Sequence, residues 1–424
     1  MEPRAGCKRM VVVGQGYVGL PLAMRAVEVG HVVVGFDTDE QRIKRLAAGE
    51  SQIEDVAAAH LDNALRSGRY RPSTDLDDCA GFDVAVIAVP TPLQEGAPDL
   101  SHIEAAGRML APLVRPGATV VLESTTYPGT TEELLVPILE EGSGLAAGHD
   151  FHVGYSPERI DPGNREWTLV NTPKVVSGID EPSLAVVRAF YETIADEVIV
   201  VSGPKEAELT KLLENTFRHV NIALVNELAM FANDLDIDLR EAIDAASTKP
   251  FGFLRFEPGP GVGGHCLPID PSYLSWRVRR RLGEPFRFVE LANDVNDHMP
   301  EYVVRRLAAA LNQQRRAVNG SRVLVLGLSY KRNTGDGRES PALRIAHHLA
   351  GMGAEVRAAD PYVDDRWVDR QIVRVDADVA EIAAADAVVL LTDHDSFDYD
   401  AIIRHARYVL DTRNRMRGDP VEHL

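Results

Sequence analysis

The chain has 424 residues, of which 45% are hydrophobic and 26% are charged, and its formal net charge is −19. This length predicts two or three domains. The negative charge argues against nucleic acid and against an anionic membrane as partners, although helix N-termini and a few arginines can still hold an anionic small ligand. No apolar run is long enough for a transmembrane helix. No small-residue cleavage site follows the first apolar run, so we expect no signal peptide.

Three cysteines, Cys7, Cys79 and Cys266, are widely spaced along the chain. Their number and spacing provide neither a disulfide framework nor a zinc ligand set. We therefore expect a protein without a bound metal that works in the reducing cytoplasm.

Short β-branched runs alternate with helical stretches in the N-terminal part of the chain, which is typical of a parallel sheet buried on both faces. The predicted strands are Met10–Val13, His31–Phe36, Val84–Val89, Thr119–Glu123, Phe151–Tyr155, Lys174–Ser177 and Val198–Val201. The alternation resumes towards the C-terminus, with predicted strands at Arg322–Leu326, Glu355–Ala359, Ala387–Leu391 and Tyr408–Asp411. These strands predict a second, smaller doubly wound domain. It lacks a GxGxxG loop, so the two sheet domains are not sequence repeats.

Between the two sheets, one long helix is predicted from Lys205 to about Leu235, with neither Pro nor Gly inside it. Its middle is apolar on more than one face, which indicates burial on several sides, either in a subunit interface or in the core of a monomer. Further helices run to about Gln314. The predicted architecture is α/β, with two doubly wound, Rossmann-like sheet domains joined by this long central helix and a helical middle domain. The expected boundaries are 1–203, 204–316 and 317–424.

A glycine-rich segment, Gly14-Gln15-Gly16-Tyr17-Val18-Gly19, follows the first strand and opens a helix. Glycines at this position let the chain turn tightly and bring backbone N–H groups to a pyrophosphate at the helix N-terminus. The second strand ends in Asp37, at the distance expected for a carboxylate that binds the adenosine ribose. Such a carboxylate repels a 2′-phosphate, so NAD is favoured over NADP. Arg42 lies nearby, and an arginine can either stack on adenine or bind a phosphate.

The segment GVGGHCLPID, Gly261–Asp270, places Cys266 directly after a glycine-rich loop. Because glycines permit close approach of the backbone to a ligand, this cysteine is either a nucleophile that faces a ligand or a buried structural thiol. On the predicted long helix, Lys211 and Asn215 lie four residues apart and share a face. A lysine beside a reacting oxygen can stabilise an oxyanion. Two further candidate segments, Ser124–Thr126 and Ser156–Arg159, follow predicted strands, where ligands gather in such sheets.

Taken together, these segments resemble the UDP-glucose/GDP-mannose dehydrogenase family, the nucleotide-sugar 6-dehydrogenases. The matching motifs follow one another in family order over nearly the whole chain. They are GQGYVGLPLA (14–23), ESTTYPGTT (123–131), SPERIDPG (156–163), EAELTKLLENTFR (206–218), GPGVGGHCLPIDP (259–271) and LGLSYKRNTGDGRESPA (326–342). The cysteine loop and the lysine helix are highly specific, whereas the glycine loop is not. The resemblance implies an NAD domain, a helical middle domain with the dimer contact, and a C-terminal domain that binds the nucleotide of the sugar.

The resemblance also implies roles for individual residues. Cys266 is similar to the nucleophile, Lys211 and Asn215 to the groups that stabilise the oxyanion and position water, and Asp270 to the partner that orients a water. Thr125 and Glu158 match the positions that handle water and the proton. The implied cofactor contacts are Gly14, Gly16, Tyr17, Val18, Gly19, Asp37, Arg42, Thr91, Thr125 and Arg338. The implied substrate contacts are Glu158, Arg159, Lys211, Asn215, Gly263, Tyr330, Lys331 and Arg255, the last of these reaching the sugar nucleotide from the partner subunit.

The implied reaction is two successive oxidations of the C6 alcohol to a carboxylate through a cysteine thioester. The HCLPIDPSYLSW continuation and the TKPFGF run that precedes the loop resemble the branch that oxidises UDP-N-acetylhexosamines, while UDP-glucose and dTDP-glucose stay open. Two more distant alternatives are a hydroxyacid dehydrogenase of the 6-phosphogluconate type and a non-catalytic protein that binds NAD or a sugar nucleotide. The first of these explains Lys211 and Asn215 but gives Cys266 no role.

Overall fold

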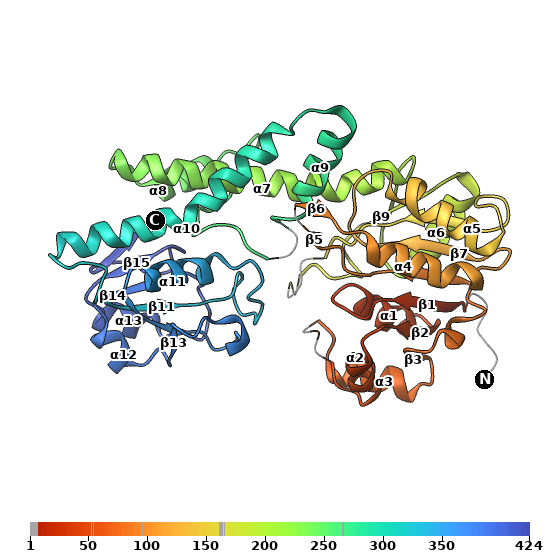
Figure 1. Ribbon diagram of the computed structural model, residues 1–424, viewed down its shortest axis with the longest axis horizontal. Helices are drawn as coiled ribbons and strands as arrows, with labels where there is room; N and C mark the ends of the chain where they lie inside the picture. The colour runs from red at the N-terminus through yellow and green to blue at the C-terminus, as the bar shows by residue number, and fades with distance from the viewer. Residues whose placement is uncertain are drawn as a thin grey trace. The chain divides into compact units, whose positions relative to one another are not determined.

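The computed structural model describes residues 7–51, 53, 55–94, 96–160, 164, 166–264 and 267–424. Cys266, the expected nucleophile, therefore lies outside the described residues. The chain forms two compact units, one of residues 1–214 and 276–282 and the other of residues 215–275 and 283–424 (Figure 1). In the described part of the chain, no helix combines the length and the apolar character that a membrane crossing requires.

The first unit is built on an eight-stranded sheet with the order β10-β9-β8-β7-β4-β1-β2-β3. Its strands are β1 (Arg9–Val13), β2 (Val32–Phe36), β3 (Tyr70–Ser73), β4 (Val84–Ile87), β7 (Thr119–Leu122), β8 (His152–Tyr155), β9 (Lys174–Gly178) and β10 (Val198–Val200). The expected strands are confirmed, and β3 is an addition at the edge. One expectation is corrected: β9 pairs antiparallel with β8. No helix lies between these two strands in the described residues, so the chain reverses direction instead of crossing over.

Helices cover both faces of this sheet because alternate residues of β1 point in opposite directions. Met10 and Val12 pack with side chains of α1 and α6, whereas Val11 and Val13 pack with side chains of α4 and α5. The helices of this unit are α1 (Gly19–Glu28), α2 (Glu40–Ala47), α3 (Ala58–Arg66), α4 (Ser101–Leu110), α5 (Val136–Ser143) and α6 (Glu181–Tyr191). A short hairpin, β5 (Leu93–Gln94) with β6 (Ala97–Pro98), follows β4.

The predicted long helix is α7, Pro204–Asp234. It begins in the first unit and ends in the second. The other helices of the middle segment are α8 (Leu239–Ser247), α9 (Asp270–Leu282) and α10 (Arg287–Gln313). Within the second unit, Ala223 of α7 packs against Ala292 and Val295 of α10.

The second unit contains a six-stranded parallel sheet with the order β13-β12-β11-β14-β15-β16. Its strands are β11 (Arg322–Leu326), β12 (Glu355–Ala359), β13 (Val373–Arg374), β14 (Ala387–Leu390), β15 (Val409–Asp411) and β16 (Val421–His423), and its helices are α11 (Pro341–Gly351), α12 (Val379–Ala384) and α13 (Tyr399–His405). Val323 and Val325 face α10 and α11, while Leu324 and Leu326 face α12 and α13. The second doubly wound domain is confirmed, with the short edge strands β13 and β16 added to the four expected.

Both sheets close the turn after their first strand in the same way. In the first unit, Gly14 N donates to Phe36 O over 2.8 Å, and Gln15 N donates to the Asp37 carboxylate over 2.8 Å. In the second unit, Gly327 N donates to Ala359 O over 2.9 Å, and Leu328 N and Ser329 N donate to the Asp360 carboxylate. The two domains therefore share a backbone device that their sequences do not reveal.

Asp360 is buried and accepts from five protein donors. Leu328 N, Ser329 N and the His394 ring lie at 2.6, 3.1 and 2.9 Å from Oδ2, and Tyr362 N and Val363 N lie at 2.8 and 2.9 Å from Oδ1. Burial acts to raise the pKa of Asp360, but the His394 ring and the backbone donors outweigh burial and lower the pKa to about 2. The carboxylate therefore stabilises the fold above its ordinary pKa, and this stabilisation is lost as the pH falls through about 2.

We expect Asp360→Asn to lower the free energy of unfolding by about 2 kcal/mol at pH 7, with roughly half of that loss left at pH 3. Denaturant unfolding followed by circular dichroism at both pH values measures the difference. The matched control is Asp376→Asn, which alters an exposed aspartate nearby. A loss of the same size at both pH values would show that Asp360 does not stabilise the domain through its charge.

Candidate active site

The glycine loop of the first unit leaves room for a ligand at one of its three glycines. A side chain at Gly14 would collide with Ala88 O at 2.4 Å, and one at Gly19 would collide with Gly14 O at 1.9 Å. A Cβ at Gly16, by contrast, would meet no atom within 4 Å. No side chain caps the N-terminus of α1, whose N-cap residue is Val18. A helix N-terminus without a side-chain cap, beside a glycine with open space, is what a pyrophosphate requires.

Asp37 lies at the end of β2 with 7% of its surface exposed. Its carboxylate accepts from Gln15 N, from Asp39 N and from Arg42 Nη1, the last over 2.8 Å. The Gln15 side chain points inward, where Tyr70 OH donates to it over 2.7 Å. Asp37 is thus fixed by the turn itself, and its carboxylate is positioned to accept hydrogen bonds from ribose hydroxyls.

The segments after β4 and β7 are joined by side chains that bond to backbone. Thr91 Oγ1 donates to Thr125 O over 2.8 Å, and Ser124 Oγ donates to Val89 O over 2.8 Å. Thr125 itself is half-buried. The hydrogen bonds tie two predicted site residues, Thr91 and Thr125, to the carboxyl edge of the sheet.

Glu208, on the first turns of α7, holds the following part of this loop. Its carboxylate accepts from Gly129 N over 2.5 Å and from Thr131 N and Oγ1 over 2.9 and 2.7 Å. Burial raises the pKa of Glu208 to about 7, against the opposing effect of these donors. The loop that carries Thr125 is therefore anchored to α7.

Glu158 follows β8 and lies almost completely buried. Arg159 N and Ile160 N donate to its Oε1 over 2.6 and 2.7 Å, and Lys174 Nζ donates to its Oε2 over 3.1 Å. The neighbouring Arg159 forms an ion pair with Glu214 of α7, with Nη2 at 2.6 Å from Oε1. The geometry thus gives Glu158 a fixed carboxylate and directs the Arg159 side chain to α7.

Lys211 and Asn215 lie one turn apart on α7, as expected. Asn215 is buried, and its Nδ2 donates to Asp270 Oδ2 over 2.5 Å. Asp270 is the first residue of α9 and is also buried. This hydrogen bond therefore connects α7 to Asp270, which stands four residues after the expected nucleophile, Cys266.

The loop that ends at Gly264, just before residues 265 and 266, which lie outside the described residues, packs tightly on Tyr330. A Cβ at Gly263 would lie 2.8 Å from the Cβ of Tyr330, and one at Gly264 would lie 2.7 Å from its ring. Gly264 N donates to Arg338 O over 3.1 Å, and the Arg338 guanidinium pairs with Asp336. Gly263, Tyr330 and Arg338, all predicted from motifs, therefore meet in one place.

Basic side chains gather beside the start of the same loop. A Cβ at Gly259 would lie 3.1 Å from Arg413 Nη1. Arg240 is buried and pairs with Glu257 over 3.0 Å, while its Nε and Nη2 have no hydrogen-bond partner among the residues that the structure describes. Arg255, the expected contact from a partner subunit, pairs with Asp244 over 2.5 Å and also with Glu257.

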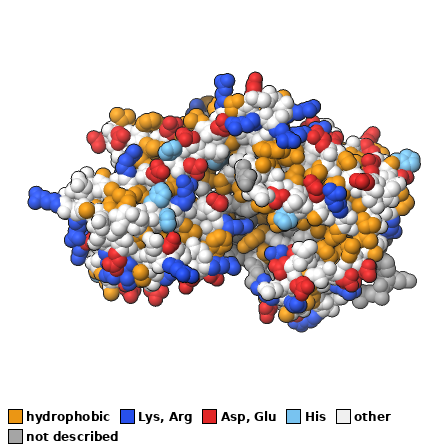
Figure 2. Space-filling view, viewed as in Figure 1, with side chains coloured by type: hydrophobic (Ala, Val, Ile, Leu, Met, Phe, Trp, Pro, Cys, Tyr) orange, Lys and Arg blue, Asp and Glu red, His pale blue; other side chains and the backbone are white. Residues whose placement is uncertain are grey.

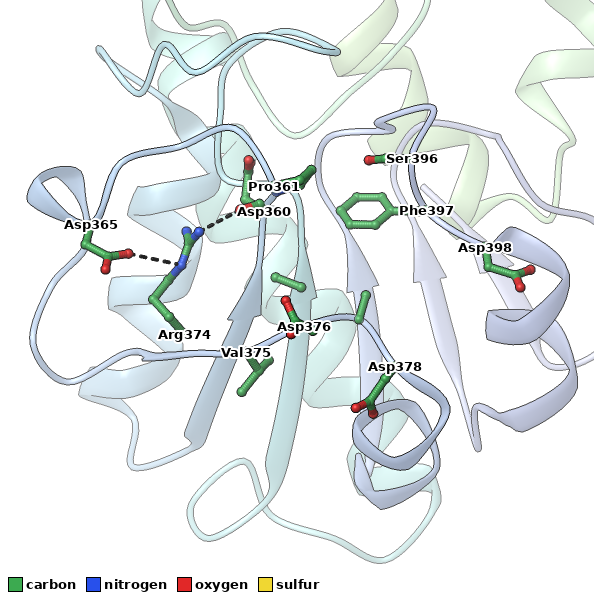
Figure 3. Close-up of a pocket in the computed structure, with 12 residues that line it drawn as sticks. Asp360, Pro361, Asp365, Arg374, Val375, Asp376, Asp378, Ser396, Phe397 and Asp398 are labelled. Atoms are coloured by element: carbon green, nitrogen blue, oxygen red, sulfur yellow. Dashed lines mark hydrogen bonds and ion pairs between the residues drawn. The ribbon is translucent and has the colours of Figure 1, made fainter.

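A hollow of about 550 Å³ lies at the carboxyl ends of β12 and β13 (Figure 3). Arg374 crosses one side of it, donating to Asp360 O over 2.6 Å and pairing with Asp365. Asp378 and Asp398 on its rim cap the short helices α12 and α13. The hollow occupies the position that the adenosine pocket has in a dinucleotide-binding sheet, but its rim carries acidic groups that repel phosphate.

Three models of one protein family match successive parts of the chain. The NAD-binding domain of the UDP-glucose/GDP-mannose dehydrogenase family matches residues 8–195, its central domain matches residues 205–298 and its UDP-binding domain matches residues 324–418. The chain belongs to this family. It is a nucleotide-sugar dehydrogenase with NAD as its cofactor, and the open space at Gly16 and the placement of Asp37 fit that cofactor.

Relatives resemble the chain over nearly its full length. UDP-N-acetyl-D-mannosamine dehydrogenase of Pyrococcus horikoshii is 36% identical over 97% of each chain. UDP-N-acetyl-D-glucosamine 6-dehydrogenase of Pseudomonas aeruginosa is 38% identical over 92% of this chain and 91% of its own. Among solved structures, the P. horikoshii UDP-D-ManNAc dehydrogenase superposes with a TM-score of 0.89 at 34% identity, covering 98% of each chain. A UDP-glucose dehydrogenase of Pyrobaculum islandicum gives 0.88 at 29% identity, covering 100% of this chain and 98% of that one.

Sequence reasoning missed the buried partners of Glu158. Lys174 was predicted only as the first residue of a strand and Glu123 as the last residue of another, yet Lys174 Nζ lies 2.9 Å from Glu123 Oε1 and 3.1 Å from Glu158 Oε2. The available signal was a charged residue at the end of an otherwise apolar strand, repeated on two strands. Arg413 and Arg240 were missed as well, because neither stands within a motif that was used.

We expect Gly16→Ala to weaken NAD binding about tenfold, or by about 1.4 kcal/mol, while the melting temperature stays unchanged. Gly19→Ala is expected to lower the melting temperature, because its methyl group meets Gly14 O. Calorimetric titration with NAD and thermal unfolding measure the two effects. Gly351→Ala, which adds a methyl group in open space on α11, is the control. Equal destabilisation by the Gly16 and Gly19 variants would instead assign both glycines to the fold.

Proposed function

We propose that the protein oxidises the C6 alcohol of a UDP-N-acetylhexosamine to a carboxylate in two successive steps, through a thioester on Cys266. The observation that carries the proposal is the buried Asn215–Asp270 hydrogen bond. It joins the lysine helix to the segment that follows Cys266 in the sequence, which supports a site that the cysteine shares with Lys211 and Asn215. We also propose the boundaries 1–203, 204–316 and 317–424 for the domains that bind NAD, form the middle and bind the nucleotide.

Each residue has a role that suits its chemistry. NAD, when bound, would accept a hydride from C6 in each of the two oxidations, first from the alcohol and then from the adduct that Cys266 forms with the aldehyde. The Cys266 thiolate adds to the aldehyde carbon and keeps it from leaving. Lys211 and Asn215 stabilise the oxyanion of the tetrahedral adduct. Asp270 orients the water that hydrolyses the thioester, and Thr125 and Glu158 handle water and the proton.

Ligand contacts follow from the same motifs. The residues that would hold NAD are Gly14, Gly16, Tyr17, Val18, Gly19 and Arg338 for the pyrophosphate, Asp37 and Arg42 for the adenosine, and Thr91 and Thr125 for the nicotinamide. The sugar nucleotide contacts Arg159, Gly263, Tyr330 and Lys331, with Arg255 supplied by the partner subunit. The basic groups of Arg240 and Arg413 beside Gly259 suit the diphosphate.

The sugar is proposed from the relatives and from the sequence around the cysteine. Proteins that oxidise UDP-N-acetylmannosamine and UDP-N-acetylglucosamine are 36% and 38% identical to this chain. The P. islandicum UDP-glucose dehydrogenase resembles it at 29% identity, so UDP-glucose and dTDP-glucose are the alternatives to test. The acid product would supply a polysaccharide pathway.

The decisive experiment counts NADH formed per sugar consumed with UDP-GlcNAc, UDP-ManNAc, UDP-GalNAc, UDP-glucose and dTDP-glucose. We expect two NADH per sugar on a UDP-N-acetylhexosamine. Cys266→Ser is expected to lose turnover by about three orders of magnitude or more while its affinity for NAD stays unchanged. Cys79→Ser, which alters a buried thiol of the first unit, is the control.

The outcomes separate the alternatives. One NADH per sugar or hydroxyacid would identify a dehydrogenase of the 6-phosphogluconate type. Binding of NAD and sugar nucleotide without NADH would identify a non-catalytic protein. Unchanged turnover in Cys266→Ser would exclude the thioester.

We also propose that the protein is a homodimer joined through α7, that it binds neither nucleic acid nor a membrane, and that it works in the cytoplasm. Within the second unit, four side chains of α7 and that of Leu235, which directly follows the helix, are all more than 40% exposed; the four are Phe217, Leu224, Leu228 and Phe231. Their spacing of seven, four, three and four residues places them on one stripe of the helix. Acidic and basic side chains are mixed on the face drawn in Figure 2, and Cys7 and Cys79 are free thiols.

A variant with Leu224→Glu and Phe231→Glu is expected to be a monomer, because two charges per chain would be buried against a second copy. Light scattering after size-exclusion chromatography measures the mass. Val379→Glu, which places the same charge on an exposed valine of α12, is expected to keep the mass of a dimer. A dimeric mass for the double variant would place the interface elsewhere.

A further inference from the structure

Four side chains that are buried in the first unit form one connected cluster around Lys174. Lys174 Nζ lies 2.9 Å from Glu123 Oε1 and 3.1 Å from Glu158 Oε2. Tyr191 OH donates to Glu123 Oε1 over 2.6 Å, and Lys174 also lies over the Tyr191 ring at 5.3 Å from its centroid. The four groups come from β9, the ends of β7 and β8, and α6, so the whole sheet edge fixes their geometry.

Charge balance distinguishes the two carboxylates. If Glu123, Glu158 and Lys174 are all ionised, the cluster holds one net negative charge in the protein interior, which is costly. Glu123 has the poorer environment for a charge, because its buried Oε2 has no hydrogen-bond partner in the described part of the chain. Glu158 has the better one, because two backbone N–H groups point at its Oε1. One proton therefore belongs on Glu123, and the negative charge belongs on Glu158.

The pKa directions agree with this geometry. Burial raises the pKa of Glu123 despite the nearby Lys174. Burial also acts to raise the pKa of Glu158, but Lys174, Ile160 N and Lys211 outweigh it, so that the pKa of Glu158 is lowered. Burial acts to lower the pKa of Lys174, and the two glutamates reverse this effect.

We propose that Lys174 is a positioning residue for Glu158. Its ammonium group, held between Glu123 and Glu158, keeps Glu158 as a carboxylate that is ready to accept a proton from water, while Glu123 stores the proton that would otherwise neutralise Glu158. This inference rests on the proposed function. In thioester hydrolysis, the water oxygen bonds to the acyl carbon, the C–S bond breaks to release the Cys266 thiolate, and the water proton passes to Glu158 and then to solvent.

Other charged groups near Glu158 do not replace Lys174. Lys211 of α7 acts on Glu158 through space. Arg159 contributes its backbone N–H, while its guanidinium is paired with Glu214 of α7 and with Pro173 O. Among the described residues, the side chain that donates a hydrogen bond to the Glu158 carboxylate is that of Lys174.

The test is the pH dependence of turnover in Lys174→Met. Without the ammonium group, burial dominates and the pKa of Glu158 rises, so the acidic limb of the rate profile is expected to move up by about one pH unit or more. Lys174→Arg keeps the charge, and its limb is expected to stay within about half a unit of the wild type. The matched control, Lys205→Met, removes an exposed lysine that pairs with Glu132 over 2.7 Å and is expected to leave the profile and the rate unchanged.

The controls separate this inference from the proposed function. If the wild type forms no NADH from any sugar nucleotide, the proposed function fails. If the wild type forms two NADH per sugar and the Lys174→Met limb does not move, only the role of Lys174 fails. Affinity for NAD is measured for each variant and is expected to stay unchanged, because the cluster lies away from the glycine loop in sequence and bonds to none of its residues.

A second measurement does not depend on the folding of Lys174→Met. Glu123→Gln replaces the protonated carboxyl group that we place on Glu123 by a neutral amide of nearly the same shape. We therefore expect the acidic limb of its rate profile to stay within about half a pH unit of the wild type, whereas Glu158→Gln is expected to lose turnover. A limb of Glu123→Gln that moves down by about one pH unit or more would show that Glu123 is charged in the wild type and would overturn the proposal.

Discussion

In both sheets the chain leaves its first strand through a turn whose backbone N–H groups are held by the aspartate that ends the neighbouring strand. A carboxylate offers about four acceptor positions. Asp37 accepts from three protein donors, one of which is the Arg42 side chain at the surface, so a ribose can still reach it. Asp360 accepts from five donors, including the buried ring of His394, and has no capacity left. The same device therefore builds a dinucleotide site in the first domain and only a rigid turn in the second.

The chemistry of the site depends on charges held away from water. Glu158, Glu123 and Lys174 are fixed by the ends of three neighbouring strands, and Glu208 fixes the loop that carries Thr125. Buried charges are costly unless each has partners, so these groups favour one arrangement of strand ends and α7 over its alternatives. The geometry of the candidate site is therefore also the geometry that the fold requires.

The sequence predicted the strands well, because a buried parallel strand is a short apolar run and such runs are easy to recognise. It predicted the motif residues Asn215 and Asp270, which the structure brings into contact. It did not predict that β9 runs antiparallel to β8, since a strand of alternating or continuous apolar residues carries no signal for the direction of its partner. Nor did it predict the Lys174 cluster, since Glu123 and Glu158 reach Lys174 only through the pairing of strands that are distant in sequence. A sequence pattern identifies the type of a segment, whereas tertiary contacts decide which charged side chains come together.

The long helix α7 buries polar groups among apolar ones, and it also exposes large apolar side chains. The buried polar groups are Glu208, Asn215, His219 and Asn226, at a spacing of seven, four and seven residues, and they lie among the buried Ala207, Leu212, Ala223, Val225, Ala229 and Ala232. Each of the four is bonded: Glu208 to the loop at Thr131, Asn215 to Asp270, His219 to Asn293, and Asn226 to Asn296 and Gly259 N. The exposed side carries the apolar stripe from Phe217 to Leu235. Placing site residues and their supports on one helix requires polar groups on its inner side, and their burial is tolerated because each has a partner. The outer stripe has no such reason within the chain, and large exposed apolar patches mark interaction surfaces. The apolar stripe and the polar residues that support the site lie on the same helix. A second copy of the chain that covered the stripe would therefore also restrict the movement of the site residues on α7.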